Sequence, residues 1–557
     1  MNTQPTSRSN YWTRPGTRFR RRGFLAGTGA TAALVLAGCG GNDDNKTTGG
    51  TQGSQTSQSD QATKTPKPGG ILRIGGGAYP ATFDHQAYAG LTGDGHVYNQ
   101  LLKLATGNKL LPDLAEKWET PDPTTFTFQL RKGVKFQNVP PVKGRELVAD
   151  DVVYTVERSR KPEFLTRQLW TNLDTITAPD KYTVKATFKQ PFAPALFHFA
   201  TSVMGVISRE VVEQFGDLKD PKSRIGTGPF LLTDARRDEI MVYKRNPDYF
   251  EPGLPYLDSI EIPIIPDRLA RTVAVRSGQI HVTGPNQGLG DMEEPKRGTS
   301  DVQVGLSVAE NITGFGFQHI FKPFSDVRVR QAVSFAMDRK EVVRAAGGSD
   351  DGGKVIGFVH PFEDPYWLST AETDSLQHKD LAEAKKLMDA AGYASGFEVA
   401  TMAHSADTAA LDALAIIQQQ LKQIGITIKP DPNDFATYVR RLGTKQFDSY
   451  FDGWPSILDP GQNFHGNLTT ASPQNYWNAN VPELDAIDAK QIKETDPVVR
   501  TGLIKDMERW NYKNPVCIAV YALNRWTAWR KEVMNYDHAR PTNGAGWQDA
   551  LVWLDKA

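Results

Sequence analysis

The sequence predicts an α/β protein with more than one lobe, and three observations support this prediction. The chain has 557 residues, which is long for one hydrophobic core, so two or more lobes are expected. Segments with helical spacing of apolar residues alternate with short apolar or alternating strands. No fixed repeat period runs through the chain, which favours a globular α/β architecture over a solenoid.

Two strand patterns occur in the first part of the predicted folded region. Ile71–Ile74 is an apolar-rich run that is typical of a buried strand. Residues 125–130 alternate between polar and apolar, which places Phe126, Phe128 and Leu130 on one face. Both segments are therefore expected in sheets that cover a core.

Three segments have the spacing of amphipathic helices. Asp150 is predicted to cap a helix with a valine-rich face. Asp326 precedes a second helix, on which Arg328 and Arg330 fall on the polar side and are expected to be solvated or in a local ion pair. A third helix ends before Gly425 and leads into a short apolar strand. Its apolar positions are Leu411, Leu414, Ile417, Leu421 and Ile424.

Charge and cysteine content narrow the functional class. The chain has 64 Lys and Arg against 64 Asp and Glu, which argues against a general nucleic-acid binder because such proteins show a strong basic excess. Its two cysteines are Cys39 and Cys517. With Cys39 modified, as argued below, no disulfide stabilises the fold, and Cys517 in its apolar run is expected to be a buried small hydrophobe.

The first 38 residues have the layout of an export signal. Arginines, including Arg20–Arg22, precede Gly23, and no acidic residue occurs before Asp43. The apolar stretch Phe24–Ala37 is shorter than the ~20 residues needed to span a bilayer, so it is predicted to be the core of a signal peptide. The segment Arg21–Leu25 resembles the twin-arginine export signal. An ordinary Sec signal with extra arginines is the alternative.

The signal is followed by a predicted lipid anchor and a linker. Leu36–Cys39 resembles the bacterial lipobox, in which two small residues precede the thiol that receives the diacylglyceryl group. Each buried methylene contributes about 0.8 kcal/mol, so two acyl chains would hold the protein on the outer face of the membrane. Residues 40–68 contain no large apolar residue and are predicted to form a flexible linker. The folded part is expected to begin at Gly69.

The folded part carries a series of short motifs in a characteristic order. They are PDLAEKWETPDPTTFTFQLRKGVKFQN (112–138), VADDVVYTVERS (148–159), GTGPF (226–230), YKRNPDYF (243–250), PYLDSIEIPIIPD (255–267), FSDVRVRQAVSFAMDRKEVV (324–343), EAKKLMDAAGY (383–393), LKQIGITI (421–428), FDSYFDGW (447–454) and PELD (482–485). On these residues the chain resembles the family 5 extracellular solute-binding proteins, the peptide, nickel and opine receptors of ABC importers. Each motif alone is weak evidence for the family, and the resemblance rests on their number and shared order. It extends from Gly69 to about Tyr536.

The resemblance implies a two-lobed periplasmic-binding-protein-like fold of type II, in the large cluster with an extra subdomain. Its lobes are joined by crossing strands and close on a ligand in the cleft between them. Lobe I would comprise residues 69–282, with a subdomain at about 95–165, and the C-terminal return 521–557. Lobe II would comprise residues 283–520.

The resemblance also implies candidate ligand contacts. In peptide-binding relatives three regions usually face the cleft, and here they correspond to Asp84–Leu91, His281–Asn286 and Gly453–Pro460. The candidate ligand-binding residues are Trp454, Gly453, Ser456, Asp459, Tyr88, Gly90, Gly284, Asn286, Tyr366 and Trp367. Packing between the lobes is the alternative role for Trp454, and core packing is the alternative for Tyr366 and Trp367.

One departure from the family pattern concerns the ligand. Peptide-binding relatives carry an Asp three residues after the Trp, whose carboxylate pairs with the α-ammonium group of the peptide. Here that position is Ile457, which would leave a buried ammonium unpaired. Asp459 matches a later Asp-Pro that usually forms a turn, and it is one alternative anchor; Asp448 and Asp452 are others. Oligosaccharides, amine-containing metabolites, metal chelates and peptides held in another way stay open.

We therefore expect a substrate-binding lipoprotein that captures a peptide or peptide-like solute and delivers it to the permease and ATPase subunits of an ABC importer. It is expected to be a monomer with no catalytic activity, cofactor or nucleic-acid partner, since no Gly-x-Ser-x-Gly or His-Glu-x-x-His motif occurs. The spacing of His85, His281, His360 and His465 does not indicate a metal site. The alternative is an extracytoplasmic sensory or binding lipoprotein for a non-peptide ligand such as an oligosaccharide, opine or metal chelate, not coupled to transport.

Overall fold

The computed structural model describes most of the chain after residue 63. The described residues are 64–80, 82–87, 94–105, 109–284, 286–287, 294–308, 311–360, 365–455, 459–472, 474–538 and 546–555. The predicted signal peptide, Cys39 and most of the predicted linker lie outside them. None of the helices in the described part is long and apolar enough to cross a membrane.

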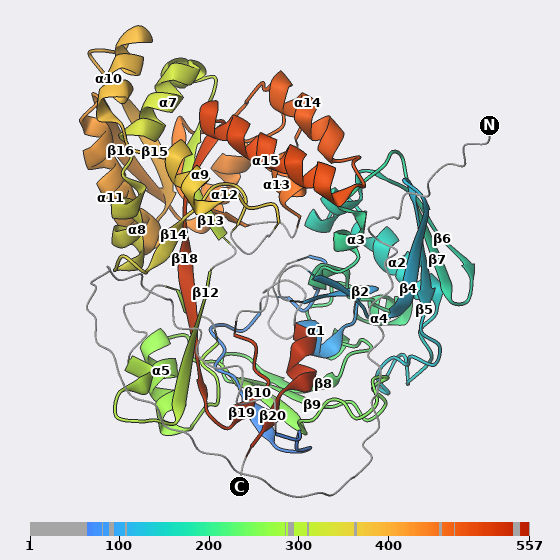
Figure 1. The fold of residues 1–557 in the computed structure, drawn as a ribbon. Helices are drawn as coiled ribbons and strands as arrows, with labels where there is room; N and C mark the ends of the chain where they lie inside the picture. Colours follow the sequence, from blue (N-terminus) through green and yellow to red (C-terminus); the bar gives the residue numbers. More distant parts are fainter. Residues whose placement is uncertain are drawn as a thin grey trace, which may run out of the picture.

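The first sheet lies at the bottom of Figure 1 and contains the N-terminal strand of the folded part. Its strands, in spatial order, are β1 (Ile71–Arg73), β10 (Ser259–Pro263), β9 (Ile240–Arg245) and β8 (Phe230–Arg236). β1 and β10 are parallel and the other pairs are antiparallel. Around this sheet lie α1 (Asp94–Val97), α5 (Arg268–Ser277) and the short pairs β2 (Leu102–Ala105) with β3 (Lys109–Pro112) and β19 (Val533–Met534) with β20 (Trp553–Leu554).

A second, antiparallel sheet extends this lobe on the right of Figure 1. Its order is β4 (Ala115–Asp122), β5 (Thr125–Leu130), β7 (Thr183–Phe188) and β6 (Leu173–Asp180), with α2 (Ala149–Ser159), α3 (Ala195–His198) and α4 (Arg209–Phe215) nearby. The alternation predicted for residues 125–130 is confirmed, since Phe126, Phe128 and Leu130 are all buried. The sheet continues to Phe188, beyond the predicted subdomain limit near 165.

The third sheet has eight strands and forms the upper lobe. Its main path is β11 (Asn286–Gln287), β18 (Cys517–Arg530), β13 (Asn311–Phe317), β17 (Ser449–Pro455), β15 (Phe397–His404) and β16 (Ile426–Asn433); β12 (Val302–Val308) and β14 (Gly353–Val355) also pair with β18.

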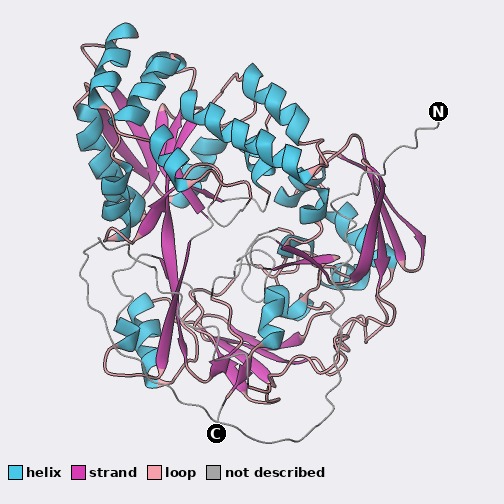
Figure 2. Cartoon of the chain, in the orientation of Figure 1, coloured by secondary structure: helices cyan, strands magenta, loops and turns pink. Residues whose placement is uncertain are grey.

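Helices cover both faces of this sheet, as Figure 2 shows. One face packs against α6 (Lys322–Ser325), α7 (Val327–Ala336), α8 (Arg339–Gly347), α10 (Leu381–Ala390) and α11 (Thr408–Lys422). The other packs against α12 (Phe435–Gly443), α13 (Pro460–Asn467), α14 (Pro482–Gln491) and α15 (Pro497–Lys513), beside which α9 (Thr370–Leu376) lies. Apolar side chains of the central strands β13 and β18 contribute to both cores.

The long strand β18 connects the two lobes. Its first half pairs with β13 through Cys517–Tyr521, and its second half pairs with β12 through Asn524–Arg530. A bridge from Trp529 to Val282 then joins β18 to the region of the first sheet. β12 and β18 therefore are crossing strands, visible as the long ribbons between upper and lower lobes in Figure 1. The predicted boundary at residue 520 falls inside β18.

The lobes also meet at the corner formed by α13, α14 and α15. The backbone N–H of Ala193 donates a hydrogen bond to the carbonyl oxygen of Ile492 at 2.8 Å. The Ile492 side chain, 3% exposed, belongs to the apolar core of the second sheet rather than to that of its own lobe. Figure 1 shows these helices beside α3. A single upper-lobe side chain thus inserts into the lobe below.

Two local predictions were wrong. Asp150 does not cap α2: the helix begins at Ala149, and Asp151 accepts a hydrogen bond from the Val148 backbone N–H at 3.0 Å. Arg330 is not solvated but buried in α7, where it donates to the carbonyl oxygens of Pro515 and Phe324. Helical spacing alone could not reveal these tertiary partners. The predicted helix after Asp326 is confirmed as α7, and Asp326 caps it by accepting a hydrogen bond from the Arg328 N–H at 2.9 Å.

Candidate ligand-binding site

The candidate site lies where β15 and β17 separate. These parallel strands pair at only two positions, the last of which is Met402↔Tyr450. β15 continues to His404 beside β16, and β17 continues to Pro455 beside β13. Beyond Tyr450, β17 therefore has one edge to which no described strand is paired. Because β16 and β17 lie on opposite sides of β15, this is a topological switch point, where open α/β sheets commonly bind ligands outside the carboxyl ends of their strands.

Gly453 lies on this open stretch of β17. A Cβ atom added there would meet Thr313 Oγ1 at 3.5 Å and the Ile312 carbonyl oxygen at 3.8 Å, which are ordinary contacts. Its φ is also outside the left-handed region. Neither packing within the protein nor the backbone conformation therefore requires glycine at this position. The adjacent Trp454 pairs with Ile312 through its backbone, but its side chain lies outside the described residues, as do Ser456 and Ile457.

Asp452 precedes Gly453 and is 7% exposed. Its Oδ1 accepts a hydrogen bond from the Gly453 N–H at 2.6 Å, and the Tyr438 hydroxyl of α12 lies within hydrogen-bonding reach. Burial, reinforced by the carboxylate of Asp407, raises the pKa of Asp452 to about 6, although the Gly453 N–H opposes that rise. We call the region between the carboxyl ends of β15 and β17, which includes His404, Tyr438 and Asp452, the β15–β17 crevice. It therefore contains a carboxylate that is costly to ionise.

Asp459, at the other end of the same loop, has a different environment. It is 1% exposed, and its two oxygens accept hydrogen bonds from the Arg500 guanidinium at 2.6 and 2.7 Å. Its Oδ1 also caps α13 by accepting the Gln462 N–H at 2.9 Å. Tyr366 contacts the same Arg500, through a side-chain hydrogen bond and a ring 5.9 Å from the guanidinium carbon. The structure thus brings together two predicted ligand contacts, Asp459 and Tyr366, in a network that holds the protein's own helices.

Comparison with known proteins identifies this arrangement. A sequence model of the bacterial extracellular solute-binding proteins, family 5, matches residues 109–476, well over half of the chain. The chain belongs to this family. The family resemblance and the periplasmic-binding-protein fold predicted from the sequence are thereby confirmed, and the protein is a solute-binding protein that acts outside the cytoplasm.

Individual relatives differ in what they bind. The solute-binding protein is 28% identical over 438 residues to di/tripeptide-binding protein 1 of Pseudomonas aeruginosa, covering 74% of this chain and 78% of that relative. It is 26% identical over 515 residues to heme-binding protein A of Haemophilus influenzae, covering 86% and 90% of the two chains. The ABC transporter-associated periplasmic binding protein DppA of Helicobacter pylori, solved in complex with the peptide STSA, has a TM-score of 0.73 at 23% identity, covering 88% of this chain and 99% of that one. That structural likeness shows the fold.

The first predicted contact region of the solute-binding protein is anchored by a buried ion pair. Asp84, 3% exposed, accepts two hydrogen bonds from the Arg158 guanidinium of α2, at 3.0 and 2.5 Å. Arg158 also donates to the Gln86 side chain. These bonds fix the chain immediately before residue 88. Tyr88 and Gly90 themselves lie outside the described residues.

The second predicted region lies where the chain enters β11. Gly284 has φ 72°, and a Cβ atom there would lie 2.9 Å from the Gly75 carbonyl oxygen. A left-handed φ and this close approach explain the glycine without a ligand. Asn286 pairs through its backbone with Trp526 of β18, and its side chain lies outside the described residues.

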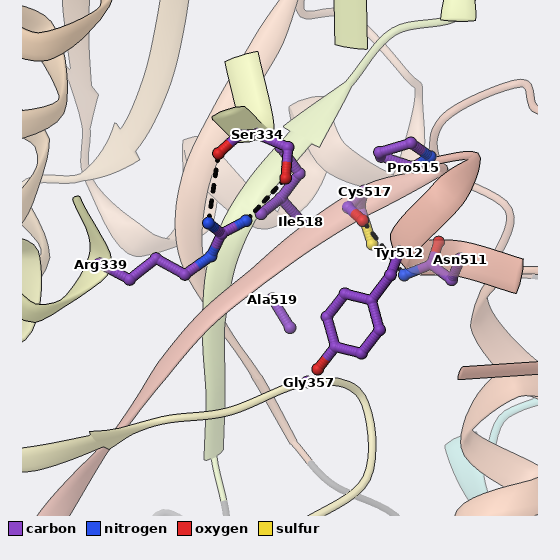
Figure 3. Close-up of a pocket in the computed structure, with 9 residues that line it drawn as sticks. All are labelled: Ser334, Arg339, Gly357, Asn511, Tyr512, Pro515, Cys517, Ile518 and Ala519. Carbon is purple, nitrogen blue, oxygen red and sulfur yellow. Dashed lines mark hydrogen bonds between the residues drawn. The ribbon is translucent and has the colours of Figure 1, made fainter. Parts of the chain in front are cut away.

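The pocket in Figure 3 is a small void in the core of the upper lobe, with room for about one water molecule. Arg339 donates to the carbonyl and hydroxyl oxygens of Ser334 there, at 3.2 and 2.7 Å. Cys517, buried as predicted, lines it as well. No member of this lining coincides with a predicted ligand contact, so the void is separate from the β15–β17 crevice.

Trp367 is half-buried and packs against the upper-lobe core.

The predicted histidines occupy separate structural positions. His85 Nε2 contacts the Gly205 carbonyl oxygen at 2.8 Å, and burial lowers its pKa to about 4. His281 Nδ1 accepts from the Arg73 N–H, and His465 pairs with Asp488 at 2.7 Å. Within the described ranges no group of three His, Cys, Asp or Glu residues could hold a metal ion.

Three crevice residues were not found from the sequence. His404, Asp407 and Tyr438 approach Asp452 from β15, α11 and α12. No local signal links them, because they become neighbours only through the crossover order of the sheet. A rule that searches the carboxyl ends of predicted parallel strands would have found His404 beside Asp452, which the sequence had already indicated.

Proposed function

We propose that this protein captures a peptide or peptide-like solute along the open edge of β17 and delivers it to the permease and ATPase of an ABC importer. The observation that carries this proposal is the edge of β17 beyond Tyr450, which lies at a switch point and to which no strand in the described part of the chain is paired. An extended peptide can add to such an edge as an extra strand, so that main-chain hydrogen bonds give affinity and side-chain pockets give selectivity.

Gly453 is the residue on which this binding mode depends most directly, because its open side lets another backbone approach. The proposed contacts also include Trp454, Ser456, Tyr88, Gly90, Asn286 and Trp367. We assign Asp459, Tyr366 and Gly284 to supporting roles, since their contacts within the protein account for them.

The location and assembly of the protein complete the proposal. A lipid on Cys39 would tether a monomeric receptor to the outer face of the membrane, with residues 40–68 as the linker. The protein has a binding role and no catalytic one. Cys39→Ser is expected to move the protein from the membrane fraction to the soluble extracytoplasmic fraction, which fractionation of expressing cells would detect.

A sensory or binding role toward a non-peptide ligand is the second candidate function. The relative named for heme binding covers even more of this chain than the one named for di- and tripeptides, and Ile457 replaces the carboxylate expected in peptide receptors. Under this alternative the crevice would hold a planar or polyhydroxylated ligand.

Thermal-shift screening and calorimetry of residues 64–557 would decide between these functions. Peptides of two to five residues should raise the melting temperature by linkage, and Gly453→Ala should weaken their binding at least tenfold. Gly502→Ala is the matched control, because Gly502 lies on α15 with open space around it, and it should bind as the wild type does. Stabilisation by heme or sugars but by no peptide would contradict the peptide assignment.

A further inference from the structure

Asp452 is a buried aspartate with which no Lys, Arg or His in the described part of the chain forms an ion pair, whereas Asp488 and Asp549 pair with His465 and His96. Buried aspartates elsewhere have arginine partners, as in Asp84 with Arg158, Asp151 with Arg145 and Asp459 with Arg500. Asp113 has none, but accepts three hydrogen bonds from Asn99 and the Gln100 N–H. The hydrogen-bond partners of Asp452 are the neighbouring Gly453 N–H and the Tyr438 hydroxyl. Burial raises the pKa of Asp113 and of Asp452 alike to about 6, and of these two carboxylates it is Asp452 that lies on the stretch of β17 beyond Tyr450.

The groups that face Asp452 do not supply a strong positive charge. Asp407, which caps α11 by accepting the Ala410 N–H at 3.0 Å, adds negative charge. Tyr438 from α12 and Tyr450 from β17 present phenols, and burial raises the pKa of both. His404 at the end of β15 is the one titratable base among these groups. The crevice thus has an excess of negative charge when Asp452 is ionised.

Keeping a buried carboxylate ionised without a counter-charge costs several kcal/mol, and an approaching cation would offset that cost. Asp452 lies on the stretch of β17 to whose second edge no described strand is paired, next to Gly453, where an added Cβ atom would meet only ordinary contacts. A ligand lying along that edge would therefore bring its own charged group to the carboxylate. A charge-assisted hydrogen bond there would be stronger than a neutral one.

We propose that Asp452 is the anchor for a cationic group of the ligand, an ammonium or guanidinium, and selects amine-bearing solutes. The inference rests on the proposed function, because it assumes that the ligand occupies the β15–β17 crevice. It assigns to Asp452 a role that the paired Asp459 cannot fill. The same carboxylate must be ionised to act, so affinity should fall as the pH drops below about 6.

The test uses three probes on residues 64–557: trialanine with a free amino terminus, N-acetyl-trialanine and spermidine. Calorimetry should show that acetylation weakens trialanine binding at least tenfold in the wild type. Asp452→Asn should lose at least tenfold for trialanine and spermidine and should no longer distinguish the acetylated peptide. Asp448→Asn is the matched control, because Asp448 is a partly buried aspartate directly before β17, and it should retain the discrimination.

A pH series separates charge pairing from loss of packing. Wild-type affinity for trialanine should decrease roughly tenfold per pH unit below about 6, whereas that of Asp452→Asn should not follow this course. Equal wild-type binding of free and acetylated trialanine would overturn the anchor while leaving peptide capture intact. If neither trialanine nor spermidine binds, the proposal that Asp452 anchors a cationic group is overturned. If N-acetyl-trialanine also fails to bind, the result counts against peptide capture itself. The wild-type discrimination needs no variant, so misfolding of Asp452→Asn would not prevent a decision.

Discussion

The α13–α15 corner and the β15–β17 crevice lie at opposite ends of one loop, and each contains a buried carboxylate. The two carboxylates differ in whether a cation compensates their charge. In the corner Asp459 has a bidentate arginine partner and caps a helix. In the crevice Asp452 has hydrogen bonds but no such cation. Complete pairing is what a structural network needs, because an unpaired buried charge is costly. Incomplete pairing beside an open strand edge is the pattern expected of a functional site.

The strongest test of the corner removes its cation. Arg500→Ala should lower the free energy of unfolding by about 3–5 kcal/mol, because it leaves Asp459 buried without a counter-charge. Denaturant unfolding would measure this. Arg509→Ala on the same helix is the control, since its partners Glu372 and Asp506 are partly exposed, and its effect should stay below about 1 kcal/mol. Equal effects of the two variants would remove the distinction between the corner and the surface.

The second test concerns the contact that the corner makes with the other lobe. Ile492→Ala should cost about 2–4 kcal/mol, because it removes a side chain from the core of the second sheet. Hydrogen exchange at the Ala193 amide should accelerate with it. Ile487→Ala is the matched variant on α14, where the side chain packs within the upper lobe, and it should leave the Ala193 amide protected. Unchanged exchange in Ile492→Ala would show that the corner does not connect the lobes.

The third test probes the cost of the crevice carboxylate. The pKa of Asp452 is raised to about 6 from 3.8, so the folded state binds more protons than the unfolded state between these pH values, and stability falls as pH rises through that window. Asp452→Asn should therefore be more stable than the wild type by roughly 3 kcal/mol at pH 7. The difference should vanish near pH 4. Melting temperatures measured from pH 4 to 7 would show it, and a destabilised variant at pH 7 would indicate a structural role for the carboxylate.

The smallest expected effect on stability is at Gly453. Because an added methyl group meets only ordinary contacts, Gly453→Ala should change the free energy of unfolding by less than about 0.5 kcal/mol while it impairs ligand binding. Gly284→Ala provides the contrast, since its φ of 72° and its approach to Gly75 predict a clear loss of stability. A large loss for Gly453→Ala would mean that this glycine serves the fold.

Local patterns predicted much of the fold. The alternation at residues 125–130, the helix after Asp326 and the third predicted helix all appear in the structure, the last as α11 before Gly425. These features depend on neighbouring residues and on which face of one element is buried. The prediction for Arg330 was wrong because its hydrogen-bond partners, the carbonyl oxygens of Pro515 and Phe324, lie outside α7 and are not indicated by the pattern of that helix.

The sequence by itself determined the family and the α/β character, because ordered motifs and periodicity are properties of the linear chain, and it predicted a candidate site at Gly453 and Trp454. Only the tertiary structure decided which acidic residue is committed to the fold. Asp459 meets an arginine 41 residues away, whereas Asp452 meets groups brought to it by the crossover of β15, β16 and β17. Charge pairing acts across space at a few ångströms, and the sequence does not record those distances.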